Sequence, residues 1–232
     1  MWYGGDRSAR TIRDIVPEFT SHVPPPCDDP VGIVHADDDV LVVHKPSGLL
    51  SVPGRFVKDC VLHRLLYDFP DARIVHRLDL DTSGLMVLAR SSRAVSTLSR
   101  AFRERQVDKV YVASVWGVPS PSSGEIAAPL APDPVRRPRH RVDPSGKPAL
   151  TRYEVIGETA TGTRLSLSPV TGRSHQLRVH LAHIGHPILG CDLYAHPDAF
   201  HSADRLLLHA TQLAFVHPVS GERVVFSSPS PF

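Results

Sequence analysis

The chain has few cysteines and no long apolar run, which excludes several classes of protein. Cys27, Cys60 and Cys191 stand far apart and form no Cys-x-x-Cys pair. This usage argues against a disulfide framework and favours a reducing compartment. No uninterrupted apolar segment is long enough to span a bilayer, and the N-terminus lacks the basic-then-apolar order of a secretory signal. We therefore expect a cytoplasmic protein that does not contact a membrane.

Three common kinds of site also lack a signature. A glycine-rich phosphate loop is absent, and Ser83 does not lie in a Gly-x-Ser-x-Gly elbow, so a nucleotide-binding loop and a serine hydrolase are not expected. His180 and His183 have the spacing of one helix face, but no Asp, Glu or Cys lies among the nearby histidines. We therefore expect no metal site.

The net charge is low as well, at +2, but basic residues are concentrated in one segment of the chain. A local basic segment on a nearly neutral chain favours an anionic partner over a generally adhesive surface. A solvated, charged loop is the alternative interpretation. The basic segment contains Arg136, Arg137, Arg139, His140, Arg141, Lys147 and Arg152.

Proline, in contrast, is abundant, with 22 residues, and favours a loop-rich chain over a helix bundle. Residues 1–30 end in a proline-rich stretch and are predicted to be an irregular extension, followed by one domain over residues 31–232. The stretch 119–148 is rich in Pro, Ser, Gly and Arg. We expect it to be a long, partly ordered excursion.

Hydrophobic periodicity predicts more strands than helices, and the strands come as hairpins. This pattern favours an α+β fold with a mainly antiparallel sheet. Helices are expected around residues 61–66, from Ser91 or Ser92 to 102, and over 175–184 before Gly185. Strands are expected at residues 31–35, 40–44, 85–89, 110–116, 151–156, 164–169, 205–215 and 223–226.

The segment 76–84, HRLDLDTSG, is the most informative part of the chain. It places an arginine two residues before the carboxylate of Asp79 and a Thr-Ser-Gly turn after it. Burial disfavours the charged form of a carboxyl group, so a carboxylate in a pocket requires a fixed cation. The segment 169–181, PVTGRSHQLRVHL, supplies two arginines, and 109–113, KVYVA, supplies an aromatic residue.

In this order the three segments resemble the signature of the pseudouridine synthases that modify uridines in ribosomal and transfer RNA. The resemblance covers residues 31–228 and includes the glycine-punctuated segment 45–55, KPSGLLSVPGR. The wording of 45–55 and 172–180 is similar to that of the dual-specificity subgroup, which acts on the anticodon stem-loop of some tRNAs and on large-subunit rRNA. The resemblance implies an isomerase that needs no cofactor, with a curved sheet around a central cleft.

The resemblance also implies roles for three catalytic residues. Asp79 would be the catalytic carboxylate, attacking the sugar or the uracil ring or acting as a base on the sugar; the sequence leaves these routes open. Arg178, rather than Arg173, would pair with Asp79, since Arg173 precedes the predicted helix and Arg178 lies inside it. Tyr111 would stack on the uracil and take part in removing the C5 proton.

Further residues are expected to bind the RNA. Arg77 would hold the nucleotide that is flipped out of its stack, and Arg173 would support its turn or contact a phosphate. The arginines of the basic segment would contact RNA phosphates, namely Arg136, Arg137, Arg139 and Arg141. The partner is expected to be a tRNA or rRNA stem-loop, bound by a monomer.

One departure from the family pattern stands out, since the family has Gly-Asp where this chain has Gly190-Cys191, with Asp192 one place later. That aspartate is expected to serve the local turn rather than the chemistry. Two alternatives to the dual-specificity enzyme are a relative restricted to another rRNA uridine and a non-catalytic RNA-binding protein.

Overall fold

The computed structural model describes residues 25–159 and 162–232. Most of the predicted N-terminal extension therefore lies outside the described residues, and residues 25–30 form no helix or strand. The helices are α1 (Val61–Leu65), α2 (Ser92–Arg103), α3 (Gln176–His183) and α4 (Pro197–His201). The strands are β1 (Gly32–Ala36), β2 (Val40–Lys45), β3 (Arg73–Ile74), β4 (Ser83–Ala89), β5 (Asp108–Trp116), β6 (Ser123–Ala127), β7 (Leu130–Pro132), β8 (His140–Val142), β9 (Leu150–Thr159), β10 (Gly162–Pro169), β11 (Leu208–Val216) and β12 (Arg223–Ser227).

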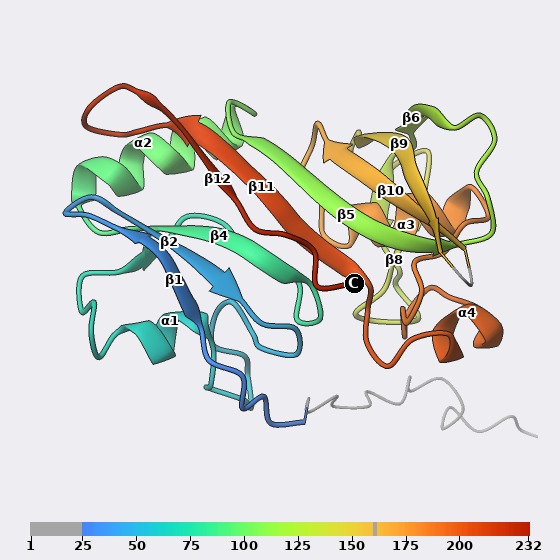
Figure 1. Cartoon of the computed structure of the whole chain (residues 1–232), viewed down its shortest axis with the longest axis horizontal. Coiled ribbons are helices and arrows are strands. Elements are labelled where there is room, and N and C mark those ends of the chain that lie inside the picture. The colour runs from blue at the N-terminus through green and yellow to red at the C-terminus, as the bar shows by residue number, and fades with distance from the viewer. Residues whose placement is uncertain (1–24, 160–161) are drawn as a thin grey trace, which may run out of the picture.

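One ten-stranded sheet runs through the described part of the molecule, in the order β1-β2-β4-β11-β5-β10-β9-β6 (Figure 1). β12 pairs with β11 and β3 with β4, while β7 and β8 form a separate two-stranded sheet. Every neighbouring pair is antiparallel except β4 and β11. The predicted α+β fold with a mainly antiparallel sheet is thus confirmed.

The half of the sheet that contains β2 and β4 is covered on both faces. Along β2, Val40 and Val42 join the apolar cluster under α2, whereas Leu41 and Val43 join the cluster under α1. Burial on both faces explains why these strands are continuous apolar runs rather than alternating sequences. Ser91 begins α2 by accepting a hydrogen bond from the Ala94 amide, as the sequence indicated.

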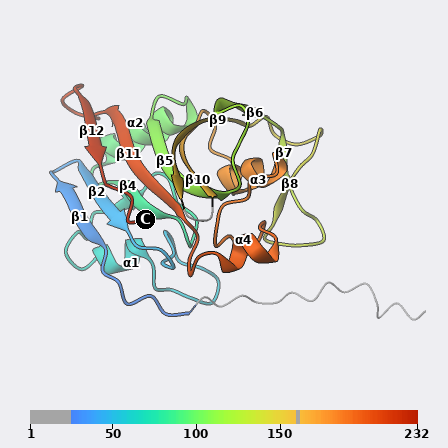
Figure 2. The same ribbon diagram turned by 45° about the vertical axis from the view of Figure 1, so that its right-hand side comes forward.

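The other half of the sheet curls around α3, with β5, β10, β9 and β6 on the outside (Figure 2). Leu177 and Leu181 of α3 pack against Leu165 and Leu167 of β10 and against Ile126 of β6. The helix is therefore held inside a curved strand layer.

The expectation for residues 119–148 was wrong in part, because this stretch contains β6, β7 and β8. β6 is an edge strand that pairs with β9 over Ser123–Ala127. Prolines are tolerated beside and at the ends of edge strands, where no ladder hydrogen bond is lost. The composition was thus a poor guide, since the pairing depends on a strand far away in the chain. The short elements β3 and α4 were not predicted either.

Among the helices of residues 25–159 and 162–232, none has the length and apolar character needed to cross a membrane.

Gly84 marks the contact between β4 and β11. It has φ +114, and a Cβ atom here would lie 2.4 Å from the carbonyl oxygen of Ala210. We expect Gly84→Ala to lower the free energy of unfolding by about 3 kcal/mol or more, because it combines backbone strain with a clash in the sheet. Chemical denaturation measures this loss. Gly157→Ala is the control, since nothing lies within 4 Å of its Cβ position. An unchanged midpoint for Gly84→Ala would contradict the expected clash.

Candidate active site

Two cavities meet at Asp79. The first has a volume of about 520 Å³ and the second about 590 Å³, and Arg77, Asp79, His175 and Arg178 line both. Tyr111 lines the first cavity only. The cavities meet between the two halves of the sheet, which agrees with the central cleft that the family resemblance implied.

Buried side chains of another segment form hydrogen bonds with the backbone on both sides of Asp79. The Ser51 hydroxyl donates to the Leu78 carbonyl at 2.7 Å and accepts from the Leu78 amide at 3.1 Å. Lys45 Nζ donates to the Leu80 carbonyl at 2.7 Å. Because Leu78 and Leu80 flank Asp79, both sides of its backbone are fixed by the segment 45–55.

Lys45 is fully buried, which is rare for an ammonium group. Its Nζ also donates to the carbonyls of Pro46 and Leu49, so carbonyl oxygens satisfy its donors. Burial lowers the pKa of Lys45 to about 7, and nearby Asp81 opposes that shift. The sequence suggested only that this segment sets turns; the contact with the Asp79 segment depends on tertiary packing.

The first turn of α3 is fixed by Gln176. Its Oε1 accepts from the Thr171 hydroxyl at 2.6 Å and the Arg173 amide at 3.0 Å, and its Nε2 donates to the Leu150 carbonyl. His175 precedes the helix with φ 55, in the left-handed region that non-glycine residues rarely adopt. This turn orients Arg178, one turn into the helix, toward the cleft.

Arg178 lies close to Asp79 but forms its shortest bond elsewhere. Its Nη1 is 4.0 Å from Oδ2 of Asp79, while its Nη2 is 2.6 Å from Oδ1 of Asp192. The predicted choice of Arg178 over Arg173 agrees with this geometry, since Arg173 Nε donates to the Pro148 carbonyl instead. A two-pronged bond from Arg178 to Asp79 is not formed.

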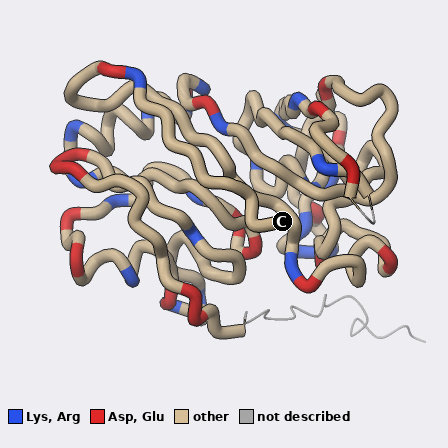
Figure 3. Tube along the Cα trace, in the orientation of Figure 1, with Lys and Arg blue, Asp and Glu red and all other residues tan. Residues whose placement is uncertain are grey.

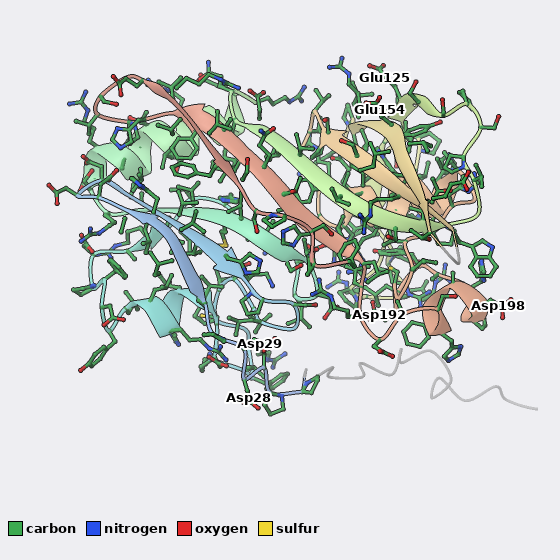
Figure 4. All side chains as sticks on the ribbon, viewed as in Figure 1. Asp28, Asp29, Glu125, Glu154, Asp192 and Asp198 are labelled. Carbon is green, nitrogen blue, oxygen red and sulfur yellow. The ribbon has the colours of Figure 1, made fainter. Side chains whose placement is uncertain are left out.

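Asp192, on the segment between α3 and α4 (Figure 4), therefore contacts the candidate catalytic cation, a contact that the expected role in the local turn did not include. Arg178 Nε also donates to Cys191 Sγ at 3.3 Å, and the guanidinium lies 5.3 Å from the ring of Tyr194. Cys191 and Asp192, where the chain departs from the family pattern, thus both contact Arg178. The shift of the aspartate by one place was the only signal in the sequence.

These neighbours keep Arg178 charged. Burial opposes its charge, but Cys191, Asp79 and Asp192 outweigh that cost and raise the pKa of Arg178. With 3% of its side chain exposed, the guanidinium is a fixed positive charge beside Asp79, whose side chain is 27% exposed. The carboxylate is thus more exposed to the cleft than its counter-charge.

Tyr111 lies on β5 and packs against the apolar clusters of both halves. Burial, together with the charge of Asp79, raises the pKa of Tyr111 above its usual value. The phenol is therefore neutral near neutral pH. Its position on a central strand places a rigid aromatic ring in the same cavity as Asp79.

The expected RNA-binding arginines divide between the cavities. Arg77 is exposed and lines both, and Arg173 lines the first. Arg136, Arg137 and Arg139 line the second cavity. Arg141 is not among the residues that line either cavity and pairs with Asp143 at 2.8 Å. Along the part of the trace that the structure describes, charges of both signs are interspersed (Figure 3).

The histidines noted in the sequence have other partners. His180 is buried and bonds to the Thr151 hydroxyl and the Ala128 carbonyl, each at 2.9 Å. Within the described ranges, no group of three or more His, Cys, Asp or Glu residues is arranged to hold a metal ion.

Comparison with known proteins identifies the family. The family model described as RNA pseudouridylate synthase matches residues 39–183, more than half of the chain. The dual-specificity RNA pseudouridine synthase RluA of Escherichia coli K12 is 50% identical over 212 residues, covering 90% of this chain and 97% of that protein. The protein of the same name from Yersinia pestis is 49% identical over 204 residues, covering 86% and 99%.

A solved structure agrees with these matches. Human RNA pseudouridylate synthase domain containing 1 is 31% identical, with a TM-score of 0.77, and the match covers 90% of this chain and 87% of that one. The prediction made from the segments 76–84, 109–113 and 169–181 is thereby confirmed: the chain belongs to the RNA pseudouridylate synthase family of isomerases.

Proposed function

We propose that this chain converts a uridine of a structured RNA into pseudouridine, with Asp79 as the catalytic carboxylate. The observation that carries the proposal is the convergence of Asp79, Tyr111 and Arg178 on one cavity of about 520 Å³. Each comes from a different element: the segment before β4, strand β5 and helix α3. The volume is within the range of small-molecule sites and suits a single everted nucleotide.

The reaction breaks the bond between N1 of uracil and C1′ of ribose and forms a bond between C5 and C1′. The proton on C5 leaves, and N1 gains one, so the product is an isomer of the substrate. Asp79 is accessible from the cavity and can act as a nucleophile or as a base. Arg178 stabilises its negative charge from 4.0 Å without a short hydrogen bond, which leaves the carboxylate oxygens free to react.

Tyr111 stacks on the uracil in this proposal. An aromatic ring against a base is worth about 1–3 kcal/mol and does not depend on which base edge is presented. Because burial raises the pKa of Tyr111, a phenolate is not available near neutral pH. We therefore assign Tyr111 to holding the ring and not to removing the C5 proton as an anion.

The substrate proposed is a uridine in a tRNA anticodon stem-loop, in large-subunit rRNA, or in both. Relatives covering most of this chain are named dual-specificity RNA pseudouridine synthases, which supports two targets. Arg77 is exposed at the junction of the cavities, where it can occupy the space that the everted nucleotide leaves. A panel of tRNA and rRNA transcripts distinguishes this enzyme from a relative restricted to one rRNA uridine.

We further propose that the chain acts as a monomer in the cytoplasm. Asp79, Tyr111 and Arg178 all come from one chain, so the catalytic set needs no second copy. Cys60 and Cys191 are buried as free thiols, which is compatible with a reducing compartment.

The Asp79 assignment is tested by Asp79→Asn, which keeps the shape of the side chain and removes its charge. We expect pseudouridine formation to fall by about 10³-fold or more, because neither a nucleophile nor a base remains. RNA affinity should stay close to that of the unmodified protein. Nucleoside chromatography of digested RNA measures the product, and a filter-binding titration measures affinity. Asp38→Asn, in the exposed turn before β2, is the control. Substantial product from Asp79→Asn would refute the assignment.

The support beneath Asp79 is tested by Ser51→Ala. This change leaves the buried amide and carbonyl of Leu78 without their partner, so we expect a loss of about 1–3 kcal/mol in the free energy of unfolding. We also expect a lower kcat with a nearly unchanged KM, since the carboxylate is less firmly placed. Ser96→Ala, on the exposed side of α2, is the control for both measurements. A stable variant with normal kcat would show that Ser51 does not position Asp79.

The part of the basic segment that lines the second cavity, Arg136, Arg137 and Arg139, is called the basic loop; it is tested by changing Arg137 and Arg139 together to Ala. Both line the second cavity, and neither forms an ion pair with another residue in the described ranges. Removing two phosphate contacts should weaken binding of an RNA stem-loop and lower the slope of log affinity against log salt by about 2. Arg141→Ala, whose guanidinium pairs with Asp143 outside the cavity, is the matched control. An effect of Arg141→Ala about half as large as that of the double change would mean that the loop contributes only net charge.

A further inference from the structure

Three cations from the end of α2 and the start of β5 line the first cavity: Arg103, Arg105 and Lys109. We call them the α2–β5 cations. They do not line the second cavity, whereas Arg136, Arg137 and Arg139 line only the second. The α2–β5 cations and the basic loop therefore lie on different sides of Asp79, which the two cavities share.

The backbone of Arg105 is unusual for its residue type. Helix α2 ends with the Arg105 amide donating to the Phe102 carbonyl at 3.3 Å and the Gln106 amide donating to the Ala101 carbonyl at 2.9 Å. This closure needs a left-handed residue, and Arg105 has φ 62. Glycine most often occupies that place, because a Cβ atom is disfavoured there. Helix closure alone does not explain an arginine.

The strained backbone at Arg105 also lies at the first cavity. Across residues 25–159 and 162–232, the non-glycine residues with positive φ are Arg105 and His175, and both line the first cavity. Strained non-glycine backbone is concentrated at functional sites, where the side chain is needed for more than the fold. His175 begins the helix that carries Arg178, and Arg105 follows the end of α2, whose last residues line the same cavity.

The charges of these residues are available for a ligand. In the described part of the chain, no hydrogen bond or ion pair joins the side chains of Arg103, Arg105 or Lys109 to another group. Asp108, the carboxylate beside Lys109 in sequence, pairs with Arg223 at 2.6 Å. Other arginines around the molecule have carboxylate partners, as Arg64 has Asp59 and Arg152 has Glu125.

Lys109 is half-buried, so its ammonium group lacks part of the hydration that an exposed lysine would have. Burial lowers its pKa, and Asp108 opposes that shift. His76, which lines the same cavity, has its pKa lowered to about 3 by burial and by the charge of Lys109, so it adds no charge. Among the described residues that line this cavity, Asp79 is the sole acidic one. An anion entering from this end would meet a positive surface before it reached Asp79.

We propose that Arg105 and Lys109, with Arg103 beside them, bind phosphates of the RNA backbone next to the everted uridine, on the α2–β5 side of Asp79. This proposal rests on the proposed function and adds a second site of RNA contact to it. The basic loop contacts the RNA on one side of the reacting nucleotide, and the α2–β5 cations contact it on the other. An RNA strand bound on both sides of Asp79 presents the nucleotide between the two contacts to the cavity.

Arg105→Gly tests the proposal without endangering the fold. Glycine is favoured at this backbone position, so the melting temperature should be unchanged or higher. Binding of a synthetic RNA hairpin with a uridine in its loop should weaken about 3- to 10-fold at about 50 mM salt, and the slope of log affinity against log salt should fall by about 1. The single-turnover rate at saturating RNA should change less than the affinity.

Arg93→Ala is the matched control, because it removes the same charge from an exposed position on α2, the helix that precedes Arg105, and lies outside both cavities. Hairpins with one uncharged methylphosphonate linkage at each loop position identify the phosphate concerned. One such linkage should weaken binding by the unmodified protein and have little further effect on Arg105→Gly. Lys109→Met should behave in the same way at the same linkage or the next one.

The outcome separates this proposal from the proposed function. If the unmodified protein forms pseudouridine while Arg105→Gly binds the hairpin with the affinity and salt slope of the unmodified protein, or of Arg93→Ala, the phosphate site is refuted and the enzyme assignment stands. If the unmodified protein forms no pseudouridine in any transcript, the enzyme assignment fails. The affinity and linkage measurements then still decide whether the α2–β5 cations bind RNA.

Discussion

The candidate site depends on one buried guanidinium, that of Arg178, whose position is fixed by residues other than Asp79. Arg178 is 3% exposed and makes its short bond to Asp192, with the sulfur of Cys191 and the ring of Tyr194 on other sides. A buried charge without partners would cost several kcal/mol, so this arrangement is also a requirement of the fold. Because Asp192 satisfies Arg178, Asp79 receives the electrostatic benefit at 4.0 Å while its oxygen atoms remain unconstrained.

Elsewhere around the cleft, too, neighbouring residues fix the position of the candidate site residues. Asp79 lies on a turn and Arg178 in the first turn of α3, whereas Tyr111 lies within a strand; buried polar side chains of neighbouring segments hold the irregular backbone beside the first two. Ser51 and Lys45 hold the residues that flank Asp79, and Gln176 holds the turn before Arg178. Irregular backbone is thus made rigid by side-chain hydrogen bonds in place of a strand ladder or helix, which is a way to preorganise a site.

Much of this arrangement could be predicted from the sequence, and the reasons for the failures are specific. Apolar runs predicted the strands of the buried half, and the resemblance to the family implied which carboxylate, tyrosine and arginine share a site. The contact between Arg178 and Asp192 could not be predicted, since it joins a helix to a loop through tertiary packing. The left-handed backbone of Arg105 was equally hidden, because nothing in the residue type indicates it. β6 was missed since its pairing partner, β9, lies beyond a proline-rich stretch.

The parallel contact of β4 with β11 has a consequence for how the molecule is assembled. β11 lies between β4 and β5 in the sheet, although it follows both by many residues in the chain. Pairings between segments so distant in sequence form slowly, since a long loop must close first. During synthesis, the strand bearing Tyr111 and the segment bearing Asp79 leave the ribosome well before the strand that joins them. We therefore expect the nascent polypeptide to gain activity only after residues 208–216 have emerged and inserted between β4 and β5.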